Sequence, residues 1–178
     1  TGDPVTGSTA TPAAGYKFDG WYRNGQMILG TENPKLDAET AKKNLNYSDE
    51  KKVYTATTFT AQFSIDDGQK VNVTYVSEDI SMGSVDHNLD EIQIRTGDTL
   101  NGSSAKANPG YTFLGWYKGD EKISDSTKLE ADVAKVNLNT ENGTYDETEF
   151  TAKFAENEEV LLQYVSEDEK KGTVDPAS

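Results

Sequence analysis

The chain has 178 residues, 34% hydrophobic and 27% charged, a composition typical of a polar but foldable globular protein rather than a disordered tail. Its 31 acidic and 17 basic side chains give a net charge of -14 at pH 7, which disfavours nucleic acid and anionic lipid as partners. The absence of cysteine excludes disulfides, thiolate metal sites and cysteine nucleophiles, and no apolar run approaches the roughly 20 residues that span a bilayer. No segment has the pattern of a signal peptide, so we expect the chain to be an internal piece of a longer protein.

A β-hairpin is the first element that the sequence predicts. Tyr16 and Phe18 alternate toward one face, but the next aromatic residue, Trp21, is out of phase with them. A bulge at the intervening glycine would return the indole to the core. The pair Asn24-Gly25 then supplies the positive-φ residues of a tight hairpin turn.

One short helix per unit is expected after the hairpin. Asn33-Pro34 offers an N-cap and a preset first turn ahead of the apolar residues that follow. In a second copy of this segment Ser126 can cap the helix. There Leu129, Val133 and Val136 recur at spacings of four and three, which predicts one apolar stripe packed on a sheet.

Half-buried strands are predicted wherever apolar and polar residues alternate, because successive side chains of a strand point to opposite faces of the sheet. Beyond the first hairpin, this alternation occurs in the segments 59–63, 71–75, 92–94, 111–116, 150–154 and 160–164. The aromatic residues of these segments should face inward and their polar neighbours should face water.

Several of these segments are copies of one another. GYKFDGWY at 15–22 returns as GYTFLGWY at 110–117, FTAQF at 59–63 returns as FTAKF at 150–154, and YVSED at 75–79 returns at 164–168. The chain is therefore a tandem duplication with a period of about 90 residues.

Two phases of this repeat are open. In the first, residues 1–66 form a repeat without its N-terminal strands, residues 67–157 form a complete repeat, and residues 158–178 start a third one. In the alternative phase the chain divides into two similar domains, 1–90 and 91–178.

The segment ATPAAGYKFDGW at 10–21, followed by FTAQF at 59–63, resembles the internalin B-repeat (Listeria-Bacteroides repeat) superfamily in its divergent branch. The resemblance covers both units almost fully. It implies an α+β, β-rich fold of tandem β-grasp-like repeats, each a small twisted sheet packed by one short helix. It also implies an extracellular protein, secreted or attached to the cell wall. These units depart from the pattern by their length, their helix and the YVSED element.

The aromatic residues of the repeated strands are the predicted structural core, because large aromatic side chains dominate core energetics. They are Tyr16, Phe18, Trp21, Phe59, Phe63, Tyr111, Phe113, Trp116, Phe150 and Phe154. Tyr22 and Tyr117 follow the tryptophans and face the other side of the sheet, so they are the candidates for contact with a ligand such as a glycan.

No catalytic, cofactor or metal site is predicted. The acidic cluster Asp86, Asp90 and Glu91 and the turn 66–68 could hold calcium through carboxylate oxygens, but neither has the spacing of an EF-hand loop. We interpret both as solvated turns or as carboxylates that cap nearby backbone amides. His87 is the only histidine and is replaced by a proline in the next copy, so no repeated catalytic site depends on it.

Two functions are compatible with these features. The first is a structural spacer or stalk in an adhesin-like bacterial surface protein, in which the repeats contact one another. The second is a binding module for a host glycan or host protein, with exposed tyrosines or an edge strand as the contact. An enzyme, a nucleic-acid partner and membrane insertion are not expected. Residues 160–178 carry a strand and turn that a truncated first unit would lack, and could complete another chain head to tail by strand exchange.

Overall fold

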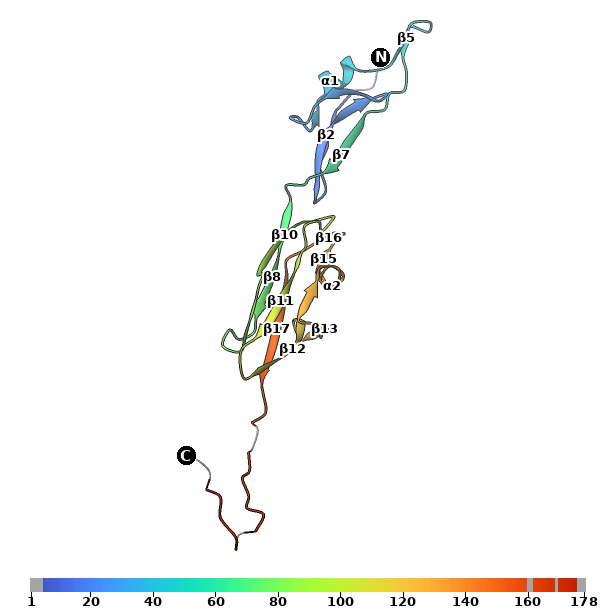
Figure 1. The fold of residues 1–178 in the computed structure, drawn as a ribbon. Helices are drawn as coiled ribbons and strands as arrows, with labels where there is room; N and C mark the ends of the chain where they lie inside the picture. The colour runs from blue at the N-terminus through green and yellow to red at the C-terminus, as the bar shows by residue number, and fades with distance from the viewer. Residues whose placement is uncertain (1–4, 160–161, 169, 176–178) are drawn as a thin grey trace.

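The computed structural model describes residues 5–159, 162–168 and 170–175. These residues form an elongated molecule in which two β-rich units follow one another along the long axis (Figure 1). No helix in the described ranges is long and apolar enough to cross a membrane.

The first unit is a three-stranded antiparallel sheet with the order β3-β2-β7, accompanied by short strand pairs and one helix. Its elements are β1 (Ser8–Thr9), β2 (Tyr16–Arg23), β3 (Gln26–Leu29), β4 (Lys35–Leu36), α1 (Ala38–Lys43), β5 (Tyr47–Ser48), β6 (Val53–Tyr54) and β7 (Thr60–Ile65). The predicted hairpin is β2–β3, and Asn24 and Gly25 at its turn both have positive φ.

The second unit repeats this plan and adds strands to it. Its elements are β8 (Lys70–Ser77), β9 (Gly83–Val85), β10 (Leu89–Gln93), β11 (Gly102–Ala107), β12 (Tyr111–Lys118), β13 (Glu121–Ser124), β14 (Lys128–Glu130), α2 (Ala131–Val136), β15 (Thr140–Glu141), β16 (Thr144–Tyr145) and β17 (Thr148–Glu156). One sheet has the order β10-β8-β17-β12-β13, and a smaller one has the order β14-β11-β9.

The first and last long strands of the second unit, β8 and β17, are parallel neighbours at the centre of the large sheet. Every other strand pair in this sheet is antiparallel. The fold is thus α+β and β-rich, as expected, with one short helix in each unit and a mixed sheet in the second. A domain boundary at residue 90 would cut β10 and separate β8 from β17.

The predicted bulge is present in both copies. The pairing of β2 with β7 shifts register between Phe18 and Gly20, and that of β12 with β17 shifts between Phe113 and Gly115. Both glycines have positive φ, 137° and 145°, a region that side chains with a Cβ rarely adopt. The extra residue turns each tryptophan back toward the core.

Both helices are shorter than the sequence indicated. Helix α1 is capped by Asp37, whose Oδ1 accepts a hydrogen bond from the Thr40 amide, and not by Asn33. The residues before each helix are instead used in strands: β4 pairs with β1, and β14 pairs with β11. The prediction of an apolar stripe on the second helix is therefore wrong at its C-terminal end. Val136 is 81% exposed, and the buried residue of α2 is Ala134.

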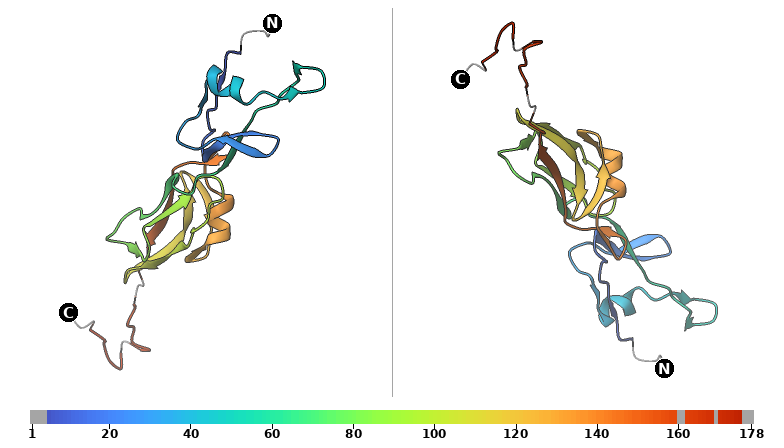
Figure 2. Two further views of the ribbon diagram at one scale, coloured as in Figure 1. Left: turned by 90° about the horizontal axis from the view of Figure 1, so that it is seen from above. Right: turned by 90° about the horizontal axis from the view of Figure 1, so that it is seen from below.

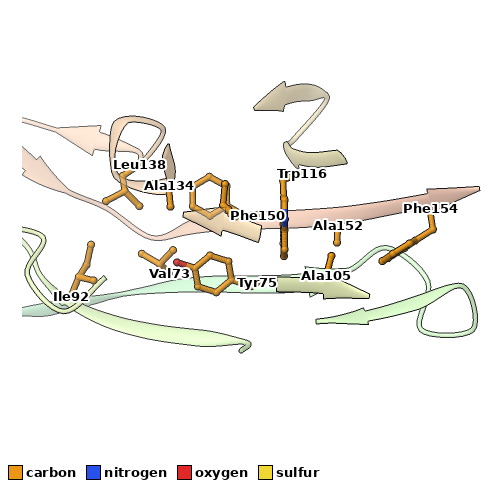
Figure 3. Packing of buried hydrophobic residues seen from close by; sticks show 11 residues of the cluster. Val73, Tyr75, Ile92, Ala105, Trp116, Ala134, Leu138, Phe150, Ala152 and Phe154 are labelled. Carbon is orange, nitrogen blue, oxygen red and sulfur yellow. The ribbon is translucent and has the colours of Figure 1, made fainter. Parts of the chain in front are cut away.

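The core of the second unit lies between its two sheets and α2. Trp116, Tyr75 and Phe150 form its centre, and Ala105 of β11 and Ala134 and Leu138 at the helix pack around them (Figure 3). Tyr75 stacks on Phe150 at 5.9 Å and meets Trp116 edge-on at 6.1 Å between ring centroids. The first unit has a smaller core around Phe18, Trp21 and the apolar residues of β4 and α1.

Candidate interaction surfaces

The two tryptophans are structural in this fold. Trp21 and Trp116 are buried, and each indole Nε1 donates a hydrogen bond to a backbone carbonyl, of Pro34 at 2.9 Å and of Thr127 at 3.1 Å. A buried indole with its N–H already paired offers no free face to a sugar.

The tyrosines that follow the tryptophans, Tyr22 and Tyr117, are both half-buried. The Nζ atom of Lys153 lies 4.9 Å from the ring centroid of Tyr117, and the same ammonium pairs with Glu78 at 3.1 Å. One ring face of Tyr117 is therefore occupied by a cation of its own sheet.

A buried carboxylate joins four segments of the second unit. Asp90 accepts hydrogen bonds from the Tyr75 hydroxyl, from the side chain and amide of Asn101, and from the Gly102 amide, and His87 Nε2 lies 2.8 Å from its Oδ1. Burial opposes ionisation, but the hydrogen bonds from Asn101, His87 and Tyr75 outweigh it, so the pKa of Asp90 lies below its ordinary value. Burial, helped by the nearby Asp90 carboxylate, raises the pKa of Tyr75 far above its ordinary value.

The interpretation of Asp90 as a solvated turn residue is thus wrong, because only 3% of it is exposed. The side chain of Asp86 does lie in a turn, where it accepts hydrogen bonds from the Ser104 amide and the Ser103 hydroxyl. The Asp66 carboxylate likewise accepts from the Gly68 amide. The described residues contain no group of three or more His, Asp or Glu arranged to hold a metal ion.

The free edge of β7 is the feature that most distinguishes the first unit from the second. In the second unit the FTAKF segment of β17 is flanked on one side by β12 and on the other by β8, and its residues Phe150, Ala152 and Phe154 are buried. In the first unit the equivalent FTAQF segment pairs with β2 alone among the described residues. Phe63 is consequently 42% exposed, against the core position that was expected for it.

A hollow of about 410 Å³ lies in the first unit next to Phe59, the residue before β7. It is lined by Trp21 and Phe59 together with Leu36, Ala41 and residues 5–8. Phe59, which was expected in the core, is only partly buried because it faces this hollow.

An exposed hairpin of the first unit, β5–β6, was not among the candidates chosen from the sequence. Tyr47 and Tyr54 meet edge-on at 5.3 Å and are half or more exposed, and the hairpin projects from the unit (Figure 2). The corresponding Tyr145 of the second unit is partly buried instead, because its ring packs against the core and lies beside Gly97. The sequence signal for this hairpin is weak and consists of two tyrosines, at positions 47 and 54, within a short polar segment.

The two units meet in a polar junction. Gln69 Oε1 accepts a hydrogen bond from the Gly15 amide at 2.8 Å, and its Nε2 donates to the Tyr16 carbonyl at 3.3 Å. Arg95 Nε donates to the Ala14 carbonyl at 2.9 Å, and the guanidinium carbon lies 4.0 Å from the centroid of the Tyr16 ring. These contacts tie the start of β2 in the first unit to the residues that precede β8 and follow β10 in the second. Tyr16, expected in a core, is thus a junction residue.

Repeated β-rich units, joined end to end by specific contacts, define a tandem structural repeat module. The chain belongs to the Divergent InlB B-repeat domain family, whose model matches residues 1–67 and 74–158. This match confirms the resemblance seen in the sequence and makes the chain a bacterial surface repeat, since repeats of this family usually occur in extracellular or surface proteins. Neither the curated proteins nor the solved structures contain a match.

Proposed function

We propose that the chain is a load-bearing spacer within a bacterial cell-surface protein, in which each unit adds length between the cell and a more distant part of the same protein. The observation that carries this proposal is the position of β8 and β17. The chain enters the second unit through the start of β8 at the junction and leaves through the end of β17 at the opposite end (Figure 1).

This geometry resists extension. Residues 73–77 of β8 pair in parallel with residues 148–152 of β17. A force that pulls the start of β8 away from the end of β17 acts along both strands. It therefore loads all of their mutual hydrogen bonds at once, whereas a force across the strands breaks such bonds one after another. Forced unfolding depends on the barrier to this step rather than on equilibrium stability.

The junction supports the same function. Its contacts hold the two sheets in line, so extension is not absorbed by a loose hinge. A strand of nine residues spans about 30 Å, so each complete unit adds a few nanometres of reach. A net charge of -14 keeps neighbouring copies soluble and apart.

We further propose that the chain acts without catalysis. Its buried carboxylate, Asp90, already accepts hydrogen bonds from several fixed donors, which leaves it poorly suited to take a proton from a substrate.

Single-molecule pulling along two directions tests the spacer function, and the absence of natural cysteine makes the attachment points simple to introduce. Lys70→Cys with Glu156→Cys loads β8 and β17 along their length. Thr112→Cys with Ala155→Cys, at paired positions of antiparallel β12 and β17, pulls those strands apart sideways. We expect a clearly higher unfolding force for the first pair.

Equal forces in the two directions would contradict the load-bearing function. Saturable binding of a purified host glycan or matrix protein that is lost in Tyr22→Ala or Tyr117→Ala would favour the binding-module alternative instead.

A further inference from the structure

Three Asn-Gly pairs occur in the chain, at 24–25, 101–102 and 142–143. Asparagine is a chemically labile residue, and a glycine after it leaves the next backbone nitrogen uncovered by any side chain. The nitrogen of the glycine can therefore react with the side chain of the asparagine. Whether it does so depends on how firmly the fold holds the two residues.

The pair at 142–143 forms the tight turn between β15 and β16. Its φ angles are 49° at Asn142 and 79° at Gly143, the turn geometry for which Asn-Gly is a preferred sequence. Both residues are exposed, and among the described residues neither the Asn142 side chain nor the Gly143 amide makes a hydrogen bond. The two groups are therefore free to rotate toward each other in contact with water.

The pair at 101–102 is held by the buried carboxylate of Asp90. Its Oδ2 accepts hydrogen bonds from the Asn101 amide at 2.9 Å and the Gly102 amide at 3.2 Å, and its Oδ1 accepts from Asn101 Nδ2 at 2.7 Å. A Cβ atom at Gly102 would lie 2.0 Å from the Leu129 carbonyl oxygen, so β14 packs closely against this backbone. A reaction within this pair requires these bonds to break and the packed backbone to rotate, so the fold protects it.

We propose that Asn142 is a site of spontaneous covalent modification and that this modification loosens the junction between the two units. The Gly143 nitrogen attacks Cγ of the Asn142 side chain and loses its proton to water. The bond from Cγ to Nδ2 then breaks, and the amide nitrogen gains a proton and leaves as ammonia. The product is a cyclic imide that includes the backbone between the two residues.

Water opens this imide at one of its two carbonyl carbons. Opening at one carbon leaves an aspartate with a normal backbone. Opening at the other leaves an isoaspartate, in which the backbone runs through the side-chain carbon atoms and gains one atom in length. Either product adds a negative charge. The isoaspartate also distorts the turn, because the backbone of a two-residue turn is matched to the twist of the strands that it joins.

The turn at 142–143 is linked to the junction through Arg95. The strands β15 and β16 lie at the end of the second unit that faces the first (Figure 1). Arg95 Nη1 donates a hydrogen bond to the Gly143 carbonyl at 3.4 Å, and the Tyr145 amide donates to the Ile94 carbonyl at 2.6 Å. The same guanidinium holds the start of β2 in the first unit. A carboxylate at position 142 draws it away, since a charged acceptor binds a guanidinium more strongly than a carbonyl does.

The pair at 24–25 provides an internal comparison. Its φ angles of 50° and 78° are almost the same as those of the pair at 142–143, and both of its residues are exposed. Asn24 Nδ2 makes one long contact, 3.5 Å from Asn46 Oδ1. We expect this pair to react as well. It lies at the end of the eight-residue strand β2 away from the junction, about 25 Å from Tyr16, so its reaction should leave the junction unchanged.

Peptide mapping by mass spectrometry tests the modification itself. The folded chain is kept in warm, mildly alkaline buffer and sampled over several weeks. We expect aspartate and isoaspartate to accumulate at positions 24 and 142 several-fold faster than at position 101. In guanidinium chloride, where the fold is lost, position 101 should react as fast as the other two. An unmodified asparagine at 142, or equal rates at 101 and 142 in the folded chain, would overturn the proposal.

Energy transfer between dyes at Lys42→Cys in α1 and Asp132→Cys in α2 tests the effect on the junction. The chain has no natural cysteine, and both positions are exposed. The distribution of inter-dye distances should broaden as the wild type ages. It should stay narrow in Asn142→Gly, because glycine fits the positive φ and has no side-chain amide to react.

Asn24→Gly is the matched control for this measurement, because it removes the reactive side chain of the first unit and should broaden with age like the wild type. Equal distributions in the aged wild type and in aged Asn142→Gly would contradict the proposed effect on the junction. Broadening that is abolished by Asn24→Gly would contradict it as well.

Discussion

Replacing the same phenylalanine in each copy of the FTAxF segment measures how much the neighbouring strand contributes to stability. Phe150 is fully buried and stacks on Tyr75 of β8, whereas Phe59 has no such strand beside it among the described residues and is partly exposed to the hollow. Phe150→Ala should lower the free energy of unfolding of the second unit by about 3 to 5 kcal/mol. Phe59→Ala should cost the first unit about 1 to 2 kcal/mol, because less of its ring is withdrawn from water.

Tryptophan fluorescence can follow each unit separately, since the chain has two tryptophans and each lies in a different core. In a Trp21→Phe background the emission reports the second unit, and in a Trp116→Phe background it reports the first. With a urea m-value of about 1 to 3 kcal/mol/M, the loss at Phe150 should shift the unfolding midpoint by about 1 to 5 M.

Equal losses at the two positions would refute this reasoning. So would a loss below about 1 kcal/mol at Phe150, because a fully buried phenylalanine ring cannot be removed from a packed core at so small a cost.

Three further predictions concern the carboxylate network, the junction and the bulge. Because the pKa of Asp90 is lower in the folded than in the unfolded chain, its contribution is present above about pH 4 and is lost as the pH falls through the folded pKa. Asp90→Asn should therefore destabilise the second unit at neutral pH by about 1 to 3 kcal/mol and flatten its acid unfolding curve; an unchanged curve would contradict this. Arg95→Ala removes the contact with Tyr16 and should broaden the inter-unit distance distribution measured by energy transfer, with unchanged melting of each unit; an unchanged distribution would show that Arg95 is dispensable at the junction. Gly115→Ala combines a φ of 145° with a Cβ only 2.8 Å from a backbone oxygen, so calorimetry should show a loss of at least about 3 kcal/mol, and more than for Gly110→Ala, whose Cβ meets nothing within 4 Å.

Local features of the fold could be predicted from the sequence because they depend on neighbouring residues. The alternation of aromatic and polar residues predicts β2, β7, β12 and β17, since side-chain direction in a strand has a period of two. The phase error between Phe18 and Trp21 predicts the bulge, and the Asn-Gly pair predicts the turn. The duplication itself is also visible as repeated segments.

The start of the helices and the burial of particular side chains could not be predicted in this way. Residues 35–36 have a reasonable helical pattern, but they form β4 because β1, far away in sequence, pairs with them. Asp90 looks like a surface acid, yet it is buried because donors from residues 75, 87, 101 and 102 converge on it.

The two copies of the FTAxF motif show separately what determines strand formation and what determines burial. FTAQF and FTAKF are nearly identical in sequence and both form strands, so the strand is determined locally by the alternation of its residues. Phe154 is buried and Phe63 is 42% exposed, so burial is determined by whether β8 and β9 lie against the strand. Side-chain direction depends on the local backbone, whereas removal from water depends on segments that only the tertiary structure brings together.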